Sequence, residues 1–331
     1  MVTQINHTAT RPFNTQHLRD LARRTNFSFT LLLPATRPGA DANRQTVLEN
    51  LLFTMDPSWL ARITQALDAH GALGGGPGLA LFAGQDFLEI FHAPVTAPLL
   101  QPGPAPFLLP LIFNSQVEKD FFVLGVCRKS PRLIHFSDGH CVEEQLPPSI
   151  PPSLEEFRGA ANRELVPTSQ WHEKEELGQY FHRLDVGLRE RTRGHRLLLL
   201  GVEEDLARYR SHVDPNQLFA GEIRSSVRDL SLSEIAQRAG ELAQQEATLA
   251  SRGHSGRLHE WPDRSRIADE LGLIESAAAE GRLQELLVPI WAPGLAHEAS
   301  LNRAAVETLR HSGDVLAVPG LAAPALALLR Y

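Results

Sequence analysis

Hydrophobic positions near the middle of the chain change their spacing within a short stretch. Phe181, Leu184 and Leu188 recur at intervals of three and four residues, which is typical of one face of an amphipathic helix. Residues 197–202 are then apolar without alternation, as in a strand buried on both faces. The acidic run 203–205 suits the first turn of a following helix, where the helix dipole favours negative charge. The pattern predicts helix, buried strand and helix, which is typical of a layered α/β domain.

The first third of the chain predicts a separate group of elements that ends in a proline-dense segment at residues 94–110. We expect helices at 15–25, 44–53 and 57–69, and strands at 27–33, 79–83 and 87–91. Prolines at this density cannot lie inside a sheet and indicate an extended connection or a boundary. We therefore place a first domain at residues 1–116.

The next group begins with three short strands near 121–127, 132–136 and 141–146, and Asp138-Gly139 between the last two is a strong hairpin signal. Residues 147–174 then form a long insert rich in Pro, Ser and Glu, which is either disordered or functional. A strand near 218–220 and a helix near 233–250 complete a middle domain at 117–250. The polar, breaker-rich segment 251–262 predicts a linker.

The last part alternates between helices and strands, which predicts a small α/β domain at 251–331. We expect helices at 264–281 and 301–312, and strands at 286–290, at 314–318 and in the final ALALLRY segment. The fold class is therefore mixed α/β (α+β), with three domains that each hold a small mixed sheet packed with helices.

Composition narrows the class of protein without naming a function. Of the 331 residues, 43% are hydrophobic and 21% charged, as in an ordinary soluble globular protein. No run reaches the ~18–20 apolar residues of a membrane helix, and no signal peptide is apparent, so we expect a cytoplasmic protein without a membrane partner. Cys127 and Cys141 make neither a disulfide framework nor a zinc site. The net charge of −7 argues against coating of DNA or RNA through bulk charge, although local basic clusters remain.

Catalytic motifs are not found in the sequence. It contains no P-loop, no G-x-S-x-G and no H-E-x-x-H motif. The Gly-rich segment 71–78 lacks the spacing of a dinucleotide fingerprint, and the 14 histidines show no metal-ligand spacing. We therefore expect no metal and no cofactor. From these patterns alone, the activity cannot be read.

The order of the segments resembles a known family. The first group, with FTLLLP and GLALFAG, resembles the N-terminal domain of archaeal and eukaryotic class-1 peptide release factors. The meander followed by YFHRLDVGL, HRLLLLGVE and LFAGEI resembles their middle domain, and LQELLVPI with the closing LLRY resembles their C-terminal domain. The chain looks like the bacterial archaeo-eukaryotic release-factor-like proteins, which are related to Pelota-type ribosome rescue factors. The likeness covers about residues 15–331.

Two functional motifs of the family are missing. Release factors hydrolyse peptidyl-tRNA with a Gly-Gly-Gln tip, and the corresponding insert 147–174 contains none. Gln170 and His172 are the candidate catalytic residues that remain in this insert. The codon-reading Asn-Ile-Lys-Ser motif is replaced at about residues 41–45, so we do not expect decoding of stop codons.

The resemblance implies a factor that binds the ribosomal A site during translation rescue or dormancy (hibernation), more as a binding protein than as an enzyme. One alternative is a peptidyl-tRNA hydrolase that uses the 147–174 loop, and another is a stress module that binds RNA or protein away from the ribosome. The implied partners are the ribosome, tRNA and a translational GTPase. The candidate RNA-binding residues are Arg11, Arg19, Arg23, Arg44, Arg128, Lys129 and Arg193. For the basic clusters, solvated helix faces are the alternative interpretation.

Overall fold

The computed structural model describes residues 11–35, 41–53, 55–69, 78–95, 97–137, 139–161 and 170–331. It separates into two compact units. Residues 1–116 and 248–331 form one, here called the terminal unit, and residues 117–247 form the other, the middle unit.

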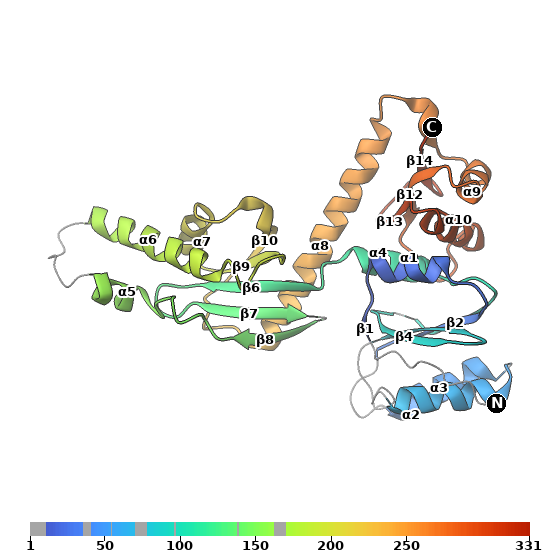
Figure 1. The fold of residues 1–331 in the computed structure, drawn as a ribbon, viewed down its shortest axis with the longest axis horizontal. Helices are drawn as coiled ribbons and strands as arrows, with labels where there is room; N and C mark the ends of the chain where they lie inside the picture. The colour runs from blue at the N-terminus through green and yellow to red at the C-terminus, as the bar shows by residue number, and fades with distance from the viewer. Residues whose placement is uncertain are drawn as a thin grey trace. The chain divides into compact units, whose positions relative to one another are not determined.

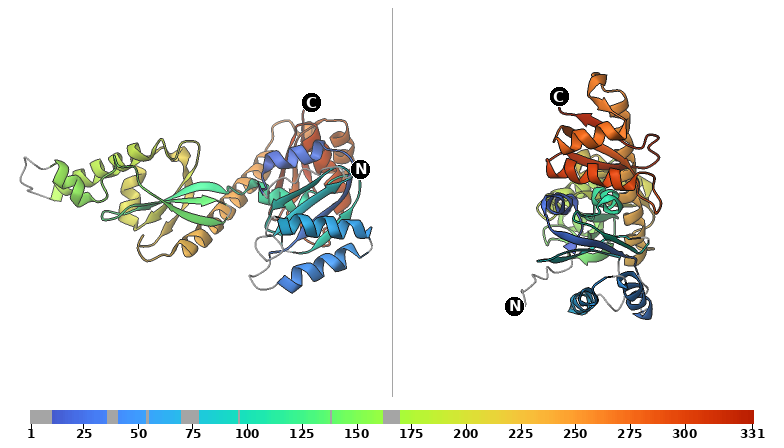
Figure 2. Two further views of the ribbon diagram at one scale, coloured as in Figure 1. Left: turned by 60° about the horizontal axis from the view of Figure 1, so that its bottom comes forward. Right: turned by 90° about the vertical axis from the view of Figure 1, so that its right-hand side faces the viewer.

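The first sheet of the terminal unit has the strand order β1-β4-β3-β2-β5. Its strands are β1 (Arg11–Pro12), β2 (Phe27–Leu33), β3 (Leu79–Gly84), β4 (Leu88–His92) and β5 (Leu99–Pro102). Its helices are α1 (Thr15–Arg23), α2 (Asp41–Leu52), α3 (Pro57–Ala69) and α4 (Leu109–Gln116). Figure 2 shows α2 and α3 against one face of this sheet and α1 against the other. β5 lies in the proline-dense segment that we expected to be a connection, and as an edge strand it tolerates the proline at its end.

The second sheet of the terminal unit has the order β11-β14-β12-β13. Its strands are β11 (Ile267–Ala268), β12 (Leu283–Pro289), β13 (Asp314–Val318) and β14 (Leu326–Leu329), with helices α9 (Leu271–Ala279) and α10 (Glu298–Arg310) and a 3-10 turn at Arg264–Arg266. β12 and β13 run parallel, and β14 is antiparallel to β12.

One hydrophobic core joins the two sheets of the terminal unit. Phe82 and Ile112 belong to the same buried cluster as Ala305 and Leu309. Asn302 adds a polar link, because its side chain donates to the Pro106 carbonyl (2.9 Å) and accepts from the Leu108 amide (2.8 Å). Segments that we assigned to a first and a third domain thus share one compact unit, and the division into three domains stays a prediction.

The middle unit holds one sheet with the order β10-β9-β6-β7-β8. Its strands are β6 (Asp120–Val126), β7 (Arg132–Ser137), β8 (His140–Glu144), β9 (Leu197–Gly201) and β10 (Leu218–Arg224). Its helices are α5 (Leu154–Ala161), α6 (Gln170–Leu188), α7 (Glu203–Arg210) and the start of α8 (Leu232–His259), with a 3-10 turn at Pro215–Gln217. The antiparallel meander β6-β7-β8 and the parallel pairing of β9 with β6 confirm mixed α/β architecture.

Helices cover both faces of this sheet (Figure 1). Leu197 and Leu199 pack in the core beneath α5, α6 and α7, whereas Leu198 and Leu200 pack in the core beneath α8. This explains the run of apolar residues without alternation, since neither face of β9 meets water.

The predicted linker 251–262 is largely wrong, because α8 continues through His259. Ser251 is buried and its hydroxyl accepts from the Gln116 amide (2.8 Å), while Leu258 lies in a buried cluster with Leu287. These contacts hold the helix despite two glycines in this segment. Among the described residues, no helix is long and apolar enough to cross a membrane.

Candidate functional site

Two helices of the middle unit, α5 and α6, form an arm at one end of the sheet (Figure 1). α5 begins at a side-chain cap, because the Ser153 hydroxyl accepts from the Glu156 amide (3.1 Å). Glu155 and Glu156 lie in its first turn, where the helix dipole favours them. The arm occupies the predicted insert, so much of that insert is helical.

Contacts between α5 and α6 fix the described part of the arm. Phe157 packs on the buried Tyr180 with 5.9 Å between ring centroids. Arg158 donates through Nε to Glu176 (2.8 Å), which ties the two helices together nearer the end of α5. The apolar and charged contacts together place the end of α5 beside the first half of α6.

The arm is also anchored to the rest of the middle unit. The Leu154 amide donates to the Arg128 carbonyl beyond the end of β6 (2.7 Å). Gly187 of α6 allows Ile150 to approach so closely that a Cβ there would lie 2.4 Å from Ile150 Cγ1. Arg183 reaches back to the Ser149 carbonyl (3.3 Å). These contacts attach the start of α5 to the end of β6, and α6 to the segment that leads into α5.

The candidate catalytic residues Gln170 and His172 lie in the first turn of α6. Their side chains, and residues 162–169 between the two helices, fall outside the described residues. Their catalytic role therefore stays a prediction.

The charge of the arm does not favour contact with phosphate. Residues 154–177 carry six carboxylate side chains against three basic ones. Affinity for an RNA backbone depends on Lys and Arg, so this arm is a poor phosphate-binding surface.

Arg128, a candidate RNA-binding residue, pairs with acidic groups of its own unit. Its guanidinium contacts Asp205 Oδ1 (2.8 Å) and Glu204 Oε1 (2.7 Å) in the first turn of α7. The hydrogen bond to Asp205 is the main reason that the pKa of Arg128 is raised. Asp205 is buried, so Arg128 compensates a buried carboxylate and is not a free phosphate ligand.

The candidates on α1 also have partners. Arg19 forms an ion pair with Asp314 (2.5 Å), and Arg23 donates to the Ser312 hydroxyl (3.1 Å). Both contacts join α1 to the start of β13 within the terminal unit. The structure brings Arg19 and Arg23 together, but as a contact between two segments of the chain.

Lys129 and Arg193 are exposed in the middle unit and are the candidates best placed to meet an external ligand. Arg11 and Arg44 lie in β1 and α2, and their side chains are outside the described residues. No single basic patch that gathers all the candidates emerges within the described part of either unit.

A histidine–aspartate cluster was not anticipated from the sequence. His135 Nε2 lies 2.6 Å from Asp120 Oδ1, and His195 Nε2 lies 3.6 Å from Asp120 Oδ2. His195 also uses Nδ1 toward the Arg193 carbonyl (3.2 Å). The cluster joins three segments of the sheet, and in the described residues no group of three or more such side chains is arranged to hold a metal ion.

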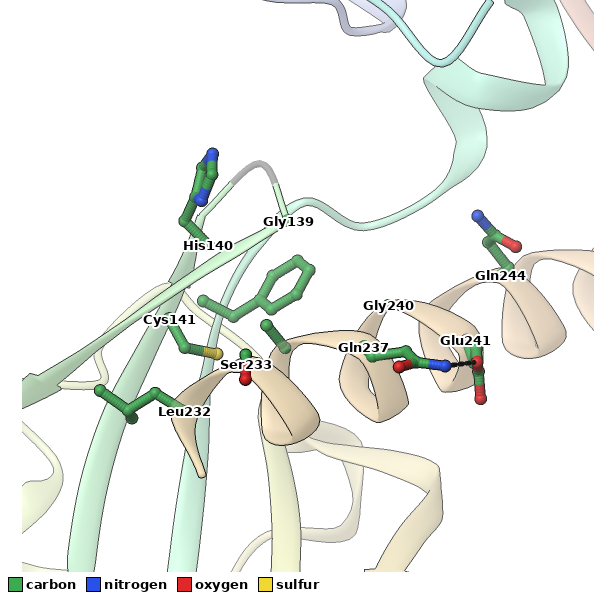
Figure 3. Close-up of a pocket in the computed structure, with 11 residues that line it drawn as sticks. Gly139, His140, Cys141, Leu232, Ser233, Gln237, Gly240, Glu241 and Gln244 are labelled. Carbon is green, nitrogen blue, oxygen red and sulfur yellow. Dashed lines mark hydrogen bonds between the residues drawn. The ribbon is translucent and has the colours of Figure 1, made fainter. Parts of the chain in front are cut away.

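A groove of about 580 Å³ lies between β8 and the first half of α8 (Figure 3). Phe136, Cys141 and Leu232 give it an apolar floor, and Gln237 and Glu241 line its helical side. Burial raises the pKa of the Cys141 thiol to about 11, so the thiol stays protonated and is a poor nucleophile at neutral pH. Sequence patterns do not predict this groove, because Cys141 and Leu232 on its two walls are about ninety residues apart.

A family model and solved structures match this chain. The model of bacterial archaeo-eukaryotic release factor family 3 matches residues 120–282. No curated protein matches the chain.

Solved structures of low identity align over nearly the whole chain. A ribosome-bound archaeal Pelota, from a model that also contains ABCE1, has 11% identity and a TM-score of 0.40, with 97% of this chain and 95% of that one covered. Archaeoglobus fulgidus Pelota has 12% identity and a TM-score of 0.39, with coverage of 97% and 93%. The archaeal translation termination factor aRF1 has 16% identity and a TM-score of 0.25, with coverage of 96% of each chain.

Proposed function

Because residues 120–282 belong to bacterial archaeo-eukaryotic release factor family 3, we propose that the protein binds the ribosomal A site as a non-hydrolytic factor in translation rescue or dormancy. The family match carries this proposal, since it includes the whole described sheet of the middle unit and the arm built on it. The family places the protein in translation termination or rescue, and the finer role is our inference.

The missing motifs support a binding role over a catalytic one. The chain contains no Gly-Gly-Gln sequence at the insert and no codon-reading motif at residues 41–45. The arm is nevertheless packed and anchored, with the Phe157–Tyr180 and Arg158–Glu176 contacts at its base. An arm that is folded but carries no Gly-Gly-Gln tip suits a factor that occupies the A site without cleaving the peptidyl-tRNA ester.

The ribosome and tRNA are the partners of this proposal, with a translational GTPase as a further partner. One related structure is described as interacting with Hbs1, a statement about the S. cerevisiae protein Dom34. For this chain, we place the RNA contacts at the exposed Lys129 and Arg193, because Arg19, Arg23 and Arg128 are already paired or hydrogen-bonded within their own units.

Sedimentation tests the proposal directly. A tagged full-length protein in lysate from stationary cells should sediment with ribosomal particles in a sucrose gradient. Arg193→Glu should reduce the sedimenting fraction severalfold by replacing a phosphate-attracting charge with a repulsive one. Arg238→Glu, at an exposed arginine of α8, is the matched control and should leave it unchanged. Protein confined to the top fractions would exclude A-site binding.

The hydrolase alternative is tested with ribosomes that carry peptidyl-tRNA. Our proposal expects no release of peptide above the spontaneous rate. Release by the wild type that Gln170→Ala abolishes would instead support hydrolysis from the 147–174 insert.

A non-ribosomal stress module is favoured by the charge of the chain. The net charge is −7, and arginines such as Arg132 and Arg196 are held by Glu143 and Glu246. This alternative predicts protein in the top fractions that still binds RNA or protein in a pull-down after ribosomes are removed.

A further inference from the structure

Strand β8 is an edge of the middle sheet, and its two glutamates are its main protection against pairing with another strand. Its five residues, HCVEE, contain no proline and no lysine, and its register with β7 is regular. Val142, at the centre of this strand, is 61% exposed to solvent. An edge strand with a regular register and an exposed apolar residue can act as a template for another strand.

The other sheet edges in the described residues are short, irregular or covered. β10, the opposite edge of the same sheet, shifts its register between Leu218 and Glu222. The edge of β13 is occupied by Gln116, whose side chain accepts from the Ala317 amide (2.7 Å) and donates to its carbonyl (3.4 Å). β1 and β11 have two residues each, and β5 ends in a proline. Among the described strands, β8 is therefore the least protected edge.

The register of β8 determines which backbone groups are free. The ladder between β7 and β8 begins with Ser137 opposite His140, and two residues of the chain connect this pair. An antiparallel ladder that starts after two residues begins with a pair that exchanges both hydrogen bonds, and such pairs alternate along the ladder. The amides and carbonyls of His140, Val142 and Glu144 thus face β7, and those of Cys141 and Glu143 face outward.

We propose that β8 pairs with β8 of a second copy of this chain, antiparallel and centred on Val142. In this register Cys141 lies opposite Glu143 of the partner subunit, so the outward backbone groups satisfy one another. Val142 meets Val142 of the partner subunit across the two-fold axis, and His140 meets Glu144 of the partner subunit. About its centre, the sequence of β8 therefore places valine against valine and histidine against glutamate.

The two glutamates of β8 do not oppose this pairing. Arg132 holds Glu143 through two hydrogen bonds of 2.9 Å, and Arg191 contacts Glu144. Each carboxylate is therefore neutralised within its own copy before the strands meet. A register centred on Glu143 would place Val142 opposite Glu144 of the partner subunit and lose the contact between the two valines, which disfavours it.

The groove beside β8 leaves room for the second strand. Cys141 lines the groove between β8 and α8 (Figure 3). In a continuous sheet, residues of the added strand that lie opposite Cys141 and Glu143 point to this same face. The groove of about 580 Å³ opens on that face.

Self-association of the purified full-length chain tests the proposal. Light scattering after size exclusion should show a dimer whose fraction grows with concentration. Val142→Lys should raise the dimer dissociation constant at least about tenfold, because two ammonium groups would face each other at the axis. Val186→Lys is the matched control, since Val186 is an exposed valine (45%) on α6, and it should have no effect. A monomer at every concentration, or a dimer that tolerates Val142→Lys, overturns the proposal.

Cross-linking tests the register itself. Directly opposed residues of a non-hydrogen-bonded pair have Cα atoms about 4.5 Å apart, which a disulfide can span. Val142→Cys should therefore form an intermolecular disulfide under mild oxidation, whereas Val186→Cys should not. Wild-type Cys141 sits diagonally from Cys141 of the partner subunit, about 7–8 Å away, and should stay unlinked. Equal cross-linking of the two variants, or capture of a foreign strand in place of a second copy, overturns it.

Discussion

The two units of this protein bury different kinds of polar group. Among the described residues, the buried polar side chains of the terminal unit are all neutral: Thr30, Asn114, Ser251, Asn302 and Thr308. The middle unit buries two carboxylates, Asp185 and Asp205, and each has an arginine partner. At buried positions the terminal unit thus uses amide and hydroxyl groups, whereas the middle unit also buries carboxylates that are paired with arginines.

This difference matters for finding an RNA-binding surface. In the middle unit, arginines are part of the internal structure, as the contacts of Arg128, Arg132 and Arg196 show. A basic residue that pairs with a buried carboxylate has little capacity left for phosphate. Counting basic residues in the sequence therefore overstates the nucleic-acid surface of this unit.

The largest expected effect comes from breaking the ion pair at the start of α7. Arg128→Met leaves the Asp205 carboxylate buried without its partner, which should lower the free energy of unfolding by about 3 kcal/mol. Hydrogen exchange of peptides from β6 and β9 would locate the loss in the middle unit.

The double variant Arg128→Met/Asp205→Leu separates the pair from its parts. Removal of both charges should cost less than removal of Arg128 alone, because no buried charge is left behind. Arg193→Met, at an exposed arginine, is the control and should change stability by less than about 0.5 kcal/mol. Equal losses for Arg128→Met and Arg193→Met would show that Arg128 does not stabilise a buried carboxylate.

The corresponding change in the terminal unit is Asn302→Ala. It removes the partner of the Leu108 amide and of the Pro106 carbonyl, both at a buried position, and should lower the unfolding free energy by about 2 kcal/mol. Urea unfolding followed by tryptophan fluorescence would measure it, since Trp59, Trp261 and Trp291 lie in this unit.

Salt dependence distinguishes the neutral hydrogen bonds of Asn302 from the ion pair of Arg128. Added salt should leave the Asn302→Ala effect unchanged, whereas it should reduce the effect of Arg128→Met, whose ion pair is partly exposed to solvent. The same salt dependence for both variants would show that the units do not differ as described.

Periodicity predicted the regular elements of the fold well. β2 at 27–33 and α3 at 57–69 have the bounds that the hydrophobic pattern gives. β9 was predicted from its unalternating apolar run, which reflects cores on both of its faces. The local hydrophobic pattern is sufficient to predict an element where the segment itself determines which of its faces are buried.

Contacts between distant segments were not predictable in this way. Arg128 and Asp205 are 77 positions apart, so the acidic start of α7 could be recognised but its partner could not. Helix α8 runs through a segment with two glycines because Ser251 and Leu258 are buried against the terminal unit. The groove beside β8 depends on the same kind of pairing, and none of these is encoded in a short stretch of sequence.

The smallest expected effect concerns pH and the middle unit. The pKa of His212 is lowered from the usual 6.5, mainly by burial. The second cause is the neighbouring His182, whose ring centroid lies 6.0 Å from that of His212. The unfolded chain therefore takes up this proton more readily than the folded one. The stability that neutral His212 contributes is present above about pH 6.5 and is lost as the pH falls through its lower, folded pKa.

His212→Asn should therefore flatten the pH dependence of unfolding below about pH 6.5, by less than the effect of Asn302→Ala. An NMR titration of the histidine rings measures the cause directly: His212 should titrate below an ordinary histidine, and His182→Asn should move it back upward. Because burial is the larger cause, the recovery in His182→Asn should be partial. A full recovery would assign the shift to charge instead, and a His212 that titrates at its ordinary pKa would show that this part of the middle unit is open to water.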